Sequence, residues 1–363
     1  MDSRKIGAII AVFTLVAVGA AAAYVVLDKE DEKDLRVVYL NKSSYETQVI
    51  AKEKGFFDKA GVSIEHITVT GSGADAVNAM LTGSADIAAC GDGPAASALN
   101  KEGDRIVVLC NVNKSTGNQI WVSGPDLANK FVLYDKENPN KEAVRDSWAA
   151  AAASKAGGEK FIKLGVQKGA TSESELKAWL DFMGIEYSDF GKAREGQPVQ
   201  LIDAKANTLV SLLDAKSIDV MGASLPYPAN ATDMVTGAKA VGNNSDNGSF
   251  GISCYITTKE VYESKTEAVK KFVEGVKLAS DYMADPANEN ECVTICANVF
   301  GTEAKNVRNV FETADFRVDW DDGSAEVLYN TVKNKGFQDK VTLQMCKDAC
   351  PADLKAHIAS LYA

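Results

Sequence analysis

The sequence predicts an α/β protein with two lobes of similar architecture, preceded by an apolar N-terminal segment. Three observations predict this fold class. Short apolar runs alternate with amphipathic stretches from residue 35 onward, and the same alternation restarts near residue 163. The chain has 363 residues, which is enough for two domains with separate cores. Strands separated by helices of this length form parallel sheets with helices on both faces.

The first lobe is expected over residues 35–122, the second over 123–245, and a return to the first lobe with C-terminal helices over 246–363. In the first lobe we predict strands over 35–40, 63–69, 85–89 and 105–111, and helices over 45–57, 74–81 and 94–100. In the second lobe we predict strands over 163–167, 199–202 and 219–223, and helices over 141–156, 172–183 and 207–215. The return contains a strand over 252–257 and helices over 265–285, 289–300, 303–312 and 325–335.

Residues 1–34 have the pattern of a signal or anchor segment followed by an acidic linker. Residues 6–27 carry no charge and span roughly 33 Å as a helix, enough to cross a bilayer. Arg4 and Lys5 precede this stretch and an acidic run follows it, which predicts a cytoplasmic N-terminus and an exported body. A cleaved signal peptide and an uncleaved anchor are both open, and the length of the apolar stretch favours the anchor. The protein is therefore expected outside the cytoplasm, either anchored in the cell membrane or released to the periplasm or cell surface.

The charge balance excludes one class of partner. The formal net charge is -11, and an acidic protein lacks the basic field that phosphate backbones require. Apolar residues make up 46% and charged residues 25%, as in ordinary globular proteins. We expect a monomer that binds no nucleic acid.

Seven cysteines lie beyond residue 89, and four of them form two pairs with three residues between the members. Export permits disulfides among these four, while free thiols or a structural metal site are the alternatives. The other three lie in apolar runs and are expected to be buried small hydrophobic residues. The two pairs are Cys292/Cys296 and Cys346/Cys350, and the others are Cys90, Cys110 and Cys254.

A ligand site is predicted where strands run into helices, because ligands of open parallel sheets bind beyond the carboxyl ends of the strands. The loops at these positions cover residues 41–45, 71–73, 91–94, 168–172 and 224–228. Several place Gly, Ser or Thr just before a helix, where free N–H groups and the helix dipole favour an anion. The candidate binding residues are Ser43, Ser44, Tyr45, Ser72, Gly73, Asp92, Gly93, Ala170, Thr171, Ser172, Ser224 and Tyr227.

Asp92 does not fit a simple anion site, because a carboxylate repels an anionic ligand. Lys42 and Lys168 on neighbouring loops could neutralise it. Asp92 could also cap its own helix, or hold the amine of a zwitterionic ligand. Tyr45 and Tyr227 could line the site as aromatic walls or belong to the core.

Several segments together resemble the solute-binding proteins of the nitrate, sulfonate and taurine ABC importers. In the first lobe they are EKGFFDKAGV (53–62), GSGA (71–74), NAMLTGSADI (78–87) and GDGP (91–94); in the second they are GATS (169–172), LLDAKSID (212–219) and Pro226. The resemblance covers roughly residues 35–320. It implies a periplasmic-binding-protein-like fold with two crossovers between the lobes and a ligand held between them. Ser224 departs from the family, which usually has an aromatic residue there, and so does the insertion over residues 125–160.

The resemblance implies an extracytoplasmic protein that captures a small anionic or zwitterionic organic solute, such as a sulfonate, taurine or nitrate. It would deliver this solute to the transmembrane permease subunit of the importer. A pyrimidine or thiamine-precursor binding protein, or a related enzyme, is one alternative, and a membrane-tethered ligand sensor is another. We expect no catalytic residues, cofactor or metal, because His66 and His357 are the only histidines and no catalytic order of Ser, His and Asp appears.

Overall fold

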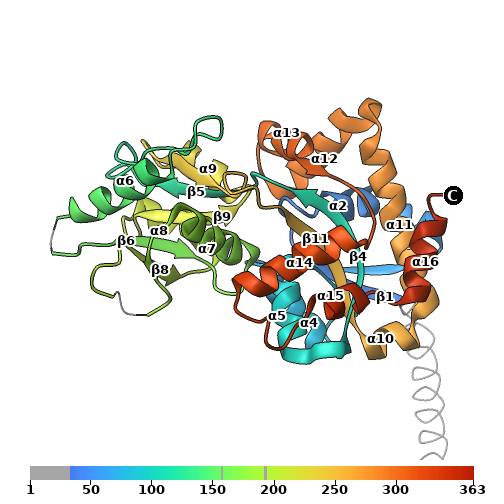
Figure 1. The fold of residues 1–363 in the computed structure, drawn as a ribbon. Coiled ribbons are helices and arrows are strands. Elements are labelled where there is room, and N and C mark those ends of the chain that lie inside the picture. The colour runs from blue at the N-terminus through green and yellow to red at the C-terminus, as the bar shows by residue number, and fades with distance from the viewer. Residues whose placement is uncertain (1–32, 157, 192–193) are drawn as a thin grey trace, which may run out of the picture. The chain divides into compact units, whose positions relative to one another are not determined.

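The computed structural model describes residues 33–156, 158–191 and 194–363, and these contain two six-stranded sheets (Figure 1). The first sheet has the order β12–β4–β11–β3–β1–β2. Its strands are β1 (Leu35–Tyr39), β2 (Ile64–Thr68), β3 (Ile87–Gly91), β4 (Ile106–Ser115), β11 (Gly251–Thr258) and β12 (Ala314–Asp315). We call this sheet and the helices packed on it the first lobe.

Helices of the first lobe come from both ends of the described chain. The N-terminal set is α2 (Glu46–Glu53), α3 (Phe56–Ala60), α4 (Gly73–Leu81) and α5 (Asp92–Glu102). The C-terminal set is α10 (Lys259–Ser264), α11 (Thr266–Ala284), α12 (Glu289–Phe300), α13 (Ala304–Thr313), α14 (Asp322–Asn334), α15 (Leu343–Asp348) and α16 (Ala352–Ser360). Both sets share one apolar core with the sheet.

The second lobe is built on a sheet with the order β10–β5–β9–β6–β8–β7. Its strands are β5 (Gln119–Ser123), β6 (Ile162–Val166), β7 (Tyr187–Ser188), β8 (Val199–Asp203), β9 (Val220–Ser224) and β10 (Lys239–Asn243). Its helices are α6 (Lys141–Ala153), α7 (Thr171–Met183), α8 (Leu209–Asp214) and α9 (Tyr227–Met234). The α/β class and the two-lobed architecture predicted from the sequence are confirmed.

Both sheets are mixed, whereas the sequence predicted parallel sheets. β1, β2 and β3 are parallel, and so are β6, β8 and β9. β11 runs antiparallel to β3 and β4, and β5 runs antiparallel to β9 and β10. β5 is the first strand after the chain passes from the first lobe to the second, and β11 is the first strand after it returns. Each of them therefore enters its sheet from the end opposite to that of the parallel strands. The expected boundary after residue 122 falls inside β5.

The predicted helix over residues 45–57 is divided into α2 and α3. Gly55 lies between them with a φ of 67°, in the left-handed region that glycine adopts without steric cost. The strand β5 and the helix α9 were missed by the sequence prediction. Both are short, and their apolar residues do not form a clear period.

The inserted segment after residue 125 contributes to the core of the second lobe. Trp148 on α6 is fully buried, with its ring centroid 4.7 Å from that of Phe131 and 5.5 Å from that of Trp179. The helix predicted over residues 141–156 is therefore more than a surface decoration. Large aromatic side chains of this kind supply much of the apolar area that a small lobe buries.

All seven cysteines are buried free thiols in the structure, which is the free-thiol alternative considered for the two pairs. Cys292 and Cys296 lie on α12, whereas Cys346 lies on α15 and Cys350 lies after the end of that helix. Burial raises the pKa of the Cys292 thiol to about 11, which keeps it protonated and unreactive at neutral pH. The expected burial of Cys90, Cys110 and Cys254 is confirmed.

Membrane attachment rests on a part of the chain that the structure does not describe. Within the described residues, no helix combines the length and the apolar character needed to cross a bilayer. The predicted anchor or signal segment over residues 6–27 lies outside the described residues.

Candidate ligand-binding site

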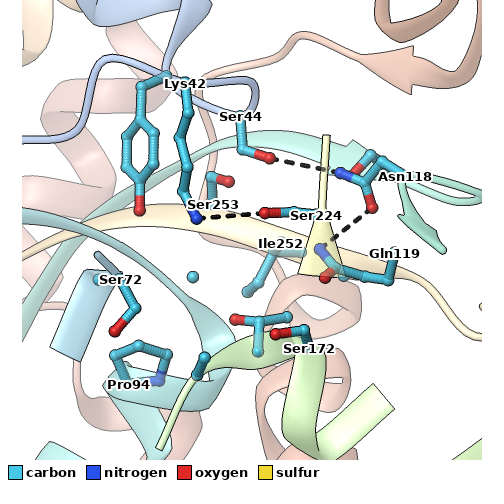
Figure 2. Close-up of a pocket in the computed structure, with 17 residues that line it drawn as sticks. Lys42, Ser44, Ser72, Pro94, Asn118, Gln119, Ser172, Ser224, Ile252 and Ser253 are labelled. Atoms are coloured by element: carbon cyan, nitrogen blue, oxygen red, sulfur yellow. Dashed lines mark hydrogen bonds between the residues drawn. The ribbon is translucent and has the colours of Figure 1, made fainter. Parts of the chain in front are cut away.

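A small cavity of about 40 Å³ is lined by residues of both lobes (Figure 2). The first lobe contributes residues from the loops after β1 and β2, from the starts of α4 and α5, from the ends of β3 and β4, and from the start of β11. The second lobe contributes residues from β5, β9 and the start of α7. The lining residues are Lys42, Ser44, Tyr45, Ser72, Gly73, Gly91, Pro94, Ser115, Asn118, Gln119, Ala170, Thr171, Ser172, Ser224, Gly251, Ile252 and Ser253.

Three helices begin at this cavity. Ser72 caps α4, where its side chain accepts a hydrogen bond from Ala74 N and its own N–H donates to Asp75. Gly91 precedes α5, and Ala170 precedes α7. The positive ends of three helix dipoles therefore face one small volume, which favours a negative charge in it.

The two lobes approach each other closely beside the cavity, at Gly93 and Thr171. Gly93 N donates a hydrogen bond to Thr171 Oγ1 over 3.2 Å. A Cβ atom added to Gly93 would lie only 2.8 Å from the backbone N and Cα of Thr171. Only glycine permits this approach, so the contact between α5 and α7 depends on that residue.

Lys42 extends across the cavity from the first lobe to the second. Its Nζ donates a hydrogen bond to Ser224 Oγ on β9 over 3.2 Å (Figure 2). Burial lowers the pKa of this ammonium to about 8, although nearby Asp75 opposes the shift. The cost of desolvation therefore exceeds the stabilisation that the surrounding groups provide.

Side-chain amides and hydroxyls form a hydrogen-bonded network around the cavity. Asn118 Nδ2 donates to Ser44 Oγ over 3.3 Å and to Ser115 Oγ over 2.8 Å. Gln167 Nε2 donates to Ser72 Oγ over 2.8 Å, so this contact also joins the lobes. Gln119 Oε1 is buried and has no hydrogen-bond partner among the described residues. A network of this kind fixes the lining side chains in one arrangement.

The structure brings most of the predicted binding residues to this cavity. Those that line it are Ser44, Tyr45, Ser72, Gly73, Ala170, Thr171, Ser172 and Ser224. Those outside the lining are Ser43, Asp92, Gly93 and Tyr227. Tyr227 begins α9 and packs against the core of the second lobe, which is the alternative considered for it. Ser43 is buried beside the cavity, with 1% of its surface exposed.

Asp92 does not line the cavity, and its carboxylate is fully buried. Its Oδ2 accepts a hydrogen bond from Thr331 Oγ1 on α14 over 2.7 Å, and its Oδ1 accepts one from Gly93 N over 2.9 Å. Lys42 bonds to Ser224, and the Nζ of Lys168 lies 5.6 Å from the Phe190 ring centroid, so the structure records no ion pair of either lysine with Asp92. Asp92 is the first residue of α5, and Gly91 occupies the cap position that was considered for it.

The lining residues that sequence reasoning missed come mainly from the two crossovers. Ser115, Asn118 and Gln119 lie where the chain passes from β4 to β5, and residues 251–253 lie where it returns into β11. Their loops precede strands, so the rule of strand-to-helix loops could not find them. Lys42 lies on a predicted loop but was assigned only to charge neutralisation.

The side chains that line the cavity carry mainly hydroxyl and amide groups, together with the ammonium of Lys42 and the phenol of Tyr45. The residues that line the cavity include no histidine, cysteine, aspartate or glutamate. The described residues also contain no cluster of three or more such side chains placed to hold a metal ion. Polar hydroxyls and amides with one ammonium are suited to binding a small polar solute.

Two α/β lobes joined by two crossovers, with a polar cavity between them, define a periplasmic-binding-type protein. Residues 28–297 match the NMT1-like family, and the chain belongs to this family. No curated protein matches the chain by sequence.

Solved structures of similar fold include periplasmic proteins named for the sulphonate or nitrate that they bind, and a protein in complex with a sulfinic acid. The chain is similar to the periplasmic aliphatic sulphonate binding protein SsuA from Escherichia coli, with 17% identity, a TM-score of 0.60, and 86% of this chain and 90% of that chain covered. The periplasmic nitrate-binding protein NrtA from Synechocystis PCC 6803 has 14% identity and a TM-score of 0.69, with 90% of this chain and 88% of that chain covered. A mutant of DszB in complex with biphenyl-2-sulfinic acid has 14% identity and a TM-score of 0.59, with 89% of this chain and 98% of that chain covered. At these identities the likeness concerns the fold.

Proposed function

We propose that this protein is the extracytoplasmic solute-binding protein of an ABC importer. It captures a small anionic or zwitterionic solute between its lobes and delivers it to the transmembrane permease subunit. The observation that carries this proposal is the polar cavity shared by both lobes, at which three helices begin. Membership of the NMT1-like family and the fold of SsuA and NrtA support it.

The proposed place of action is outside the cytoplasm, and the predicted segment over residues 6–27 would hold the protein at the membrane or direct its export. A monomer suffices for this role, because one chain supplies both walls of the cavity. Of the twelve binding residues predicted from the sequence, we propose as ligand contacts only those that line the cavity.

An enzyme of the same fold is the second candidate, since DszB has a similar structure. The histidines are poorly placed for this role. His66 lies on β2 and its Nδ1 is 3.2 Å from Gln48 Nε2, while His357 lies on α16. Neither lines the cavity. A membrane-tethered sensor would use the same site and differ only in its partner.

A thermal-shift panel tests the proposal. The purified full chain is heated with sulfonates, taurine, nitrate, hydrogencarbonate and pyrimidines in turn. A solute that binds only the folded state, at about 100 times its Kd, adds about 2.7 kcal/mol to the free energy of unfolding. We expect a rise of a few degrees in Tm with a sulfonate, taurine, nitrate or hydrogencarbonate. A rise with pyrimidines alone would favour the thiamine-precursor alternative, and no rise with any solute would contradict the proposal.

A further inference from the structure

A buried carboxyl group lies where the two lobes meet the crossover that leads back into β11. Glu175 is on α7, one turn after Thr171, and only 2% of its surface is exposed. Its neighbours come from different parts of the molecule: Asp92 lies on α5 of the first lobe, whereas Asn244 and Ser249 lie on the returning crossover. A movement of one lobe against the other therefore changes the surroundings of this carboxyl group.

The Glu175 carboxyl group is buried without a positively charged partner. Its Oε2 makes no hydrogen bond among the described residues, and neither does the buried Nδ2 of Asn244. The charge that acts on it comes from Asp92, a second carboxyl group, and not from a lysine or an arginine. Asp92 is itself fully buried, with its oxygens bonded to Thr331 Oγ1 and Gly93 N. An ionised carboxylate in such surroundings is strongly unfavourable.

The charges between α5, α7 and α14 do not balance. α5 and α14 of the first lobe pack against α7 of the second (Figure 1). Among the described residues, three carboxyl groups are buried here, those of Asp92, Glu173 and Glu175. Lys335 and Lys177 both pair with Glu173, at 3.7 and 2.8 Å, and Lys335 also acts on Asp92. One negative charge is therefore in excess, and a proton on Glu175 would remove it.

The other charged groups around α7 do not supply the missing positive charge. Asp189 pairs with Lys177, and Asp246 on the returning crossover accepts a hydrogen bond from Trp179 Nε1, so both add negative charge. β5 and β9, which pack against α7, have no charged residue. α6 also packs against α7, and none of its charged side chains is buried: Lys141, Glu142, Arg145 and Asp146. Within the described residues, no cation is placed to neutralise the Glu175 carboxylate.

We propose that closure of the two lobes takes up one proton from solvent, which is held on Glu175, and that opening releases it. This inference rests on the proposed function, in which the lobes open and close around a solute. When the lobes part, Asp92 moves away from Glu175 and water reaches the carboxyl group, which then ionises like an exposed side chain. Closure expels this water and brings the two carboxyl groups together again, so the proton stabilises the closed form.

The electrostatics of Glu175 give this coupling a direction. Burial raises the pKa of Glu175 well above its ordinary value of 4.5, Asp92 raises it further, and Asn244 and Ser249 oppose the shift without cancelling it. Because the pKa is higher in the closed form, the proton's stabilisation of that form is full below pH 4.5 and is lost as the pH rises. The closing equilibrium weakens by up to about tenfold per pH unit. A solute that binds the closed form would bind more weakly in alkaline surroundings.

Amide hydrogen exchange of the full chain tests the proposal without any solute. Gly93 N donates to Thr171 Oγ1 across the lobes, so separation of the lobes exposes this amide. After correction for the intrinsic exchange rate, its protection in the wild type should fall by up to about 100-fold between pH 6 and pH 8. Glu175→Gln, whose amide resembles the protonated carboxyl group, should show little of this fall. Asp181→Asn is the matched control, because Asp181 is an exposed carboxylate on the same helix, and it should keep the wild-type fall.

Infrared spectroscopy detects the proton itself. At pH 7 the wild type should show the C=O absorption of a protonated carboxyl group that is missing in Glu175→Gln. The inference would be overturned by protection of Gly93 that does not depend on pH, by an equal fall in Glu175→Gln, or by spectra without this difference. These measurements need no solute, so binding in the thermal-shift panel would still support the proposed function if the inference failed.

Discussion

A buried ion pair between α14 and α7 is predicted to hold the two lobes together beside the cavity. Lys335 follows the last residue of α14 in the first lobe, and Glu173 lies in the first turn of α7 in the second. Lys335 Nζ is 3.7 Å from Glu173 Oε2, and the side chains are 7% and 8% exposed. Glu173 Oε2 also accepts a hydrogen bond from Gly169 N over 2.6 Å, just before the start of α7. Breaking the pair should therefore loosen the start of α7.

The magnitude follows from the distances. At 3.7 Å and an effective dielectric constant of about 20, the Coulomb attraction is about 4–5 kcal/mol. Desolvation of Lys335, which lowers its pKa, offsets a large part of this attraction. Glu173 also keeps Lys177 as a partner at 2.8 Å, so it is not left unpaired. We expect Lys335→Met to weaken the contact between the lobes at this point by about 1–2 kcal/mol of free energy.

Hydrogen–deuterium exchange measures this loss without a ligand. In Lys335→Met, amides in the first turns of α7 should exchange about 5- to 30-fold faster, because local opening becomes less costly by about 1–2 kcal/mol. Lys333→Met is the matched control, since Lys333 is exposed on the same helix and its Nζ lies 5.4 Å from the Tyr329 ring centroid. Unchanged exchange in α7, or equal acceleration in both variants, would refute the reasoning.

Three further perturbations have defined outcomes. Gly93→Ala places a Cβ 2.8 Å from the Thr171 backbone, so it should part the lobes and accelerate exchange in α7 at least as much as Lys335→Met. Burial raises the pKa of Glu46 from 4.5 to about 7, so its contribution to stability is full below pH 4.5 and is lost as the pH rises through 7. In urea unfolding, Glu46→Gln should therefore be more stable than the wild type at pH 8, and this gain should vanish at pH 4. Burial lowers the His66 pKa from 6.5 to about 4, so stability should fall below pH 6.5, and His66→Gln should flatten that fall.

The parts of the fold that follow local rules were predictable. β1 and α12 have the bounds that apolar periodicity gives them to within one residue, because each buries a clear stripe of apolar residues. β5 was not predicted, since its five residues alternate only weakly and gain their place from pairing with β9 and β10. Pairing partners distant in the chain are not encoded in a local pattern.

In the candidate site too, residues with a local sequence signature were predicted and residues placed by long-range contacts were not. Ser72 and Thr171 were found because a small polar residue at a helix start has a local signature. Asn118 and Ser253 were missed because they reach the cavity through the crossovers. The orientation of Asp92 depends on Thr331, which is 239 residues away in the chain, so no local pattern could reveal it.

Binding of a small solute between the lobes is the central claim, and Ser172→Trp tests it most directly. Ser172 is the second residue of α7, is 6% exposed and lines the cavity, so an indole there would fill the volume. The full chain and the variant are titrated calorimetrically with sodium nitrate, sodium hydrogencarbonate, taurine and butanesulfonate, and their Tm values are compared without solute. The account predicts that the wild type binds one of these solutes and that Ser172→Trp, still folded, binds none. Equal affinity in a folded variant would contradict it.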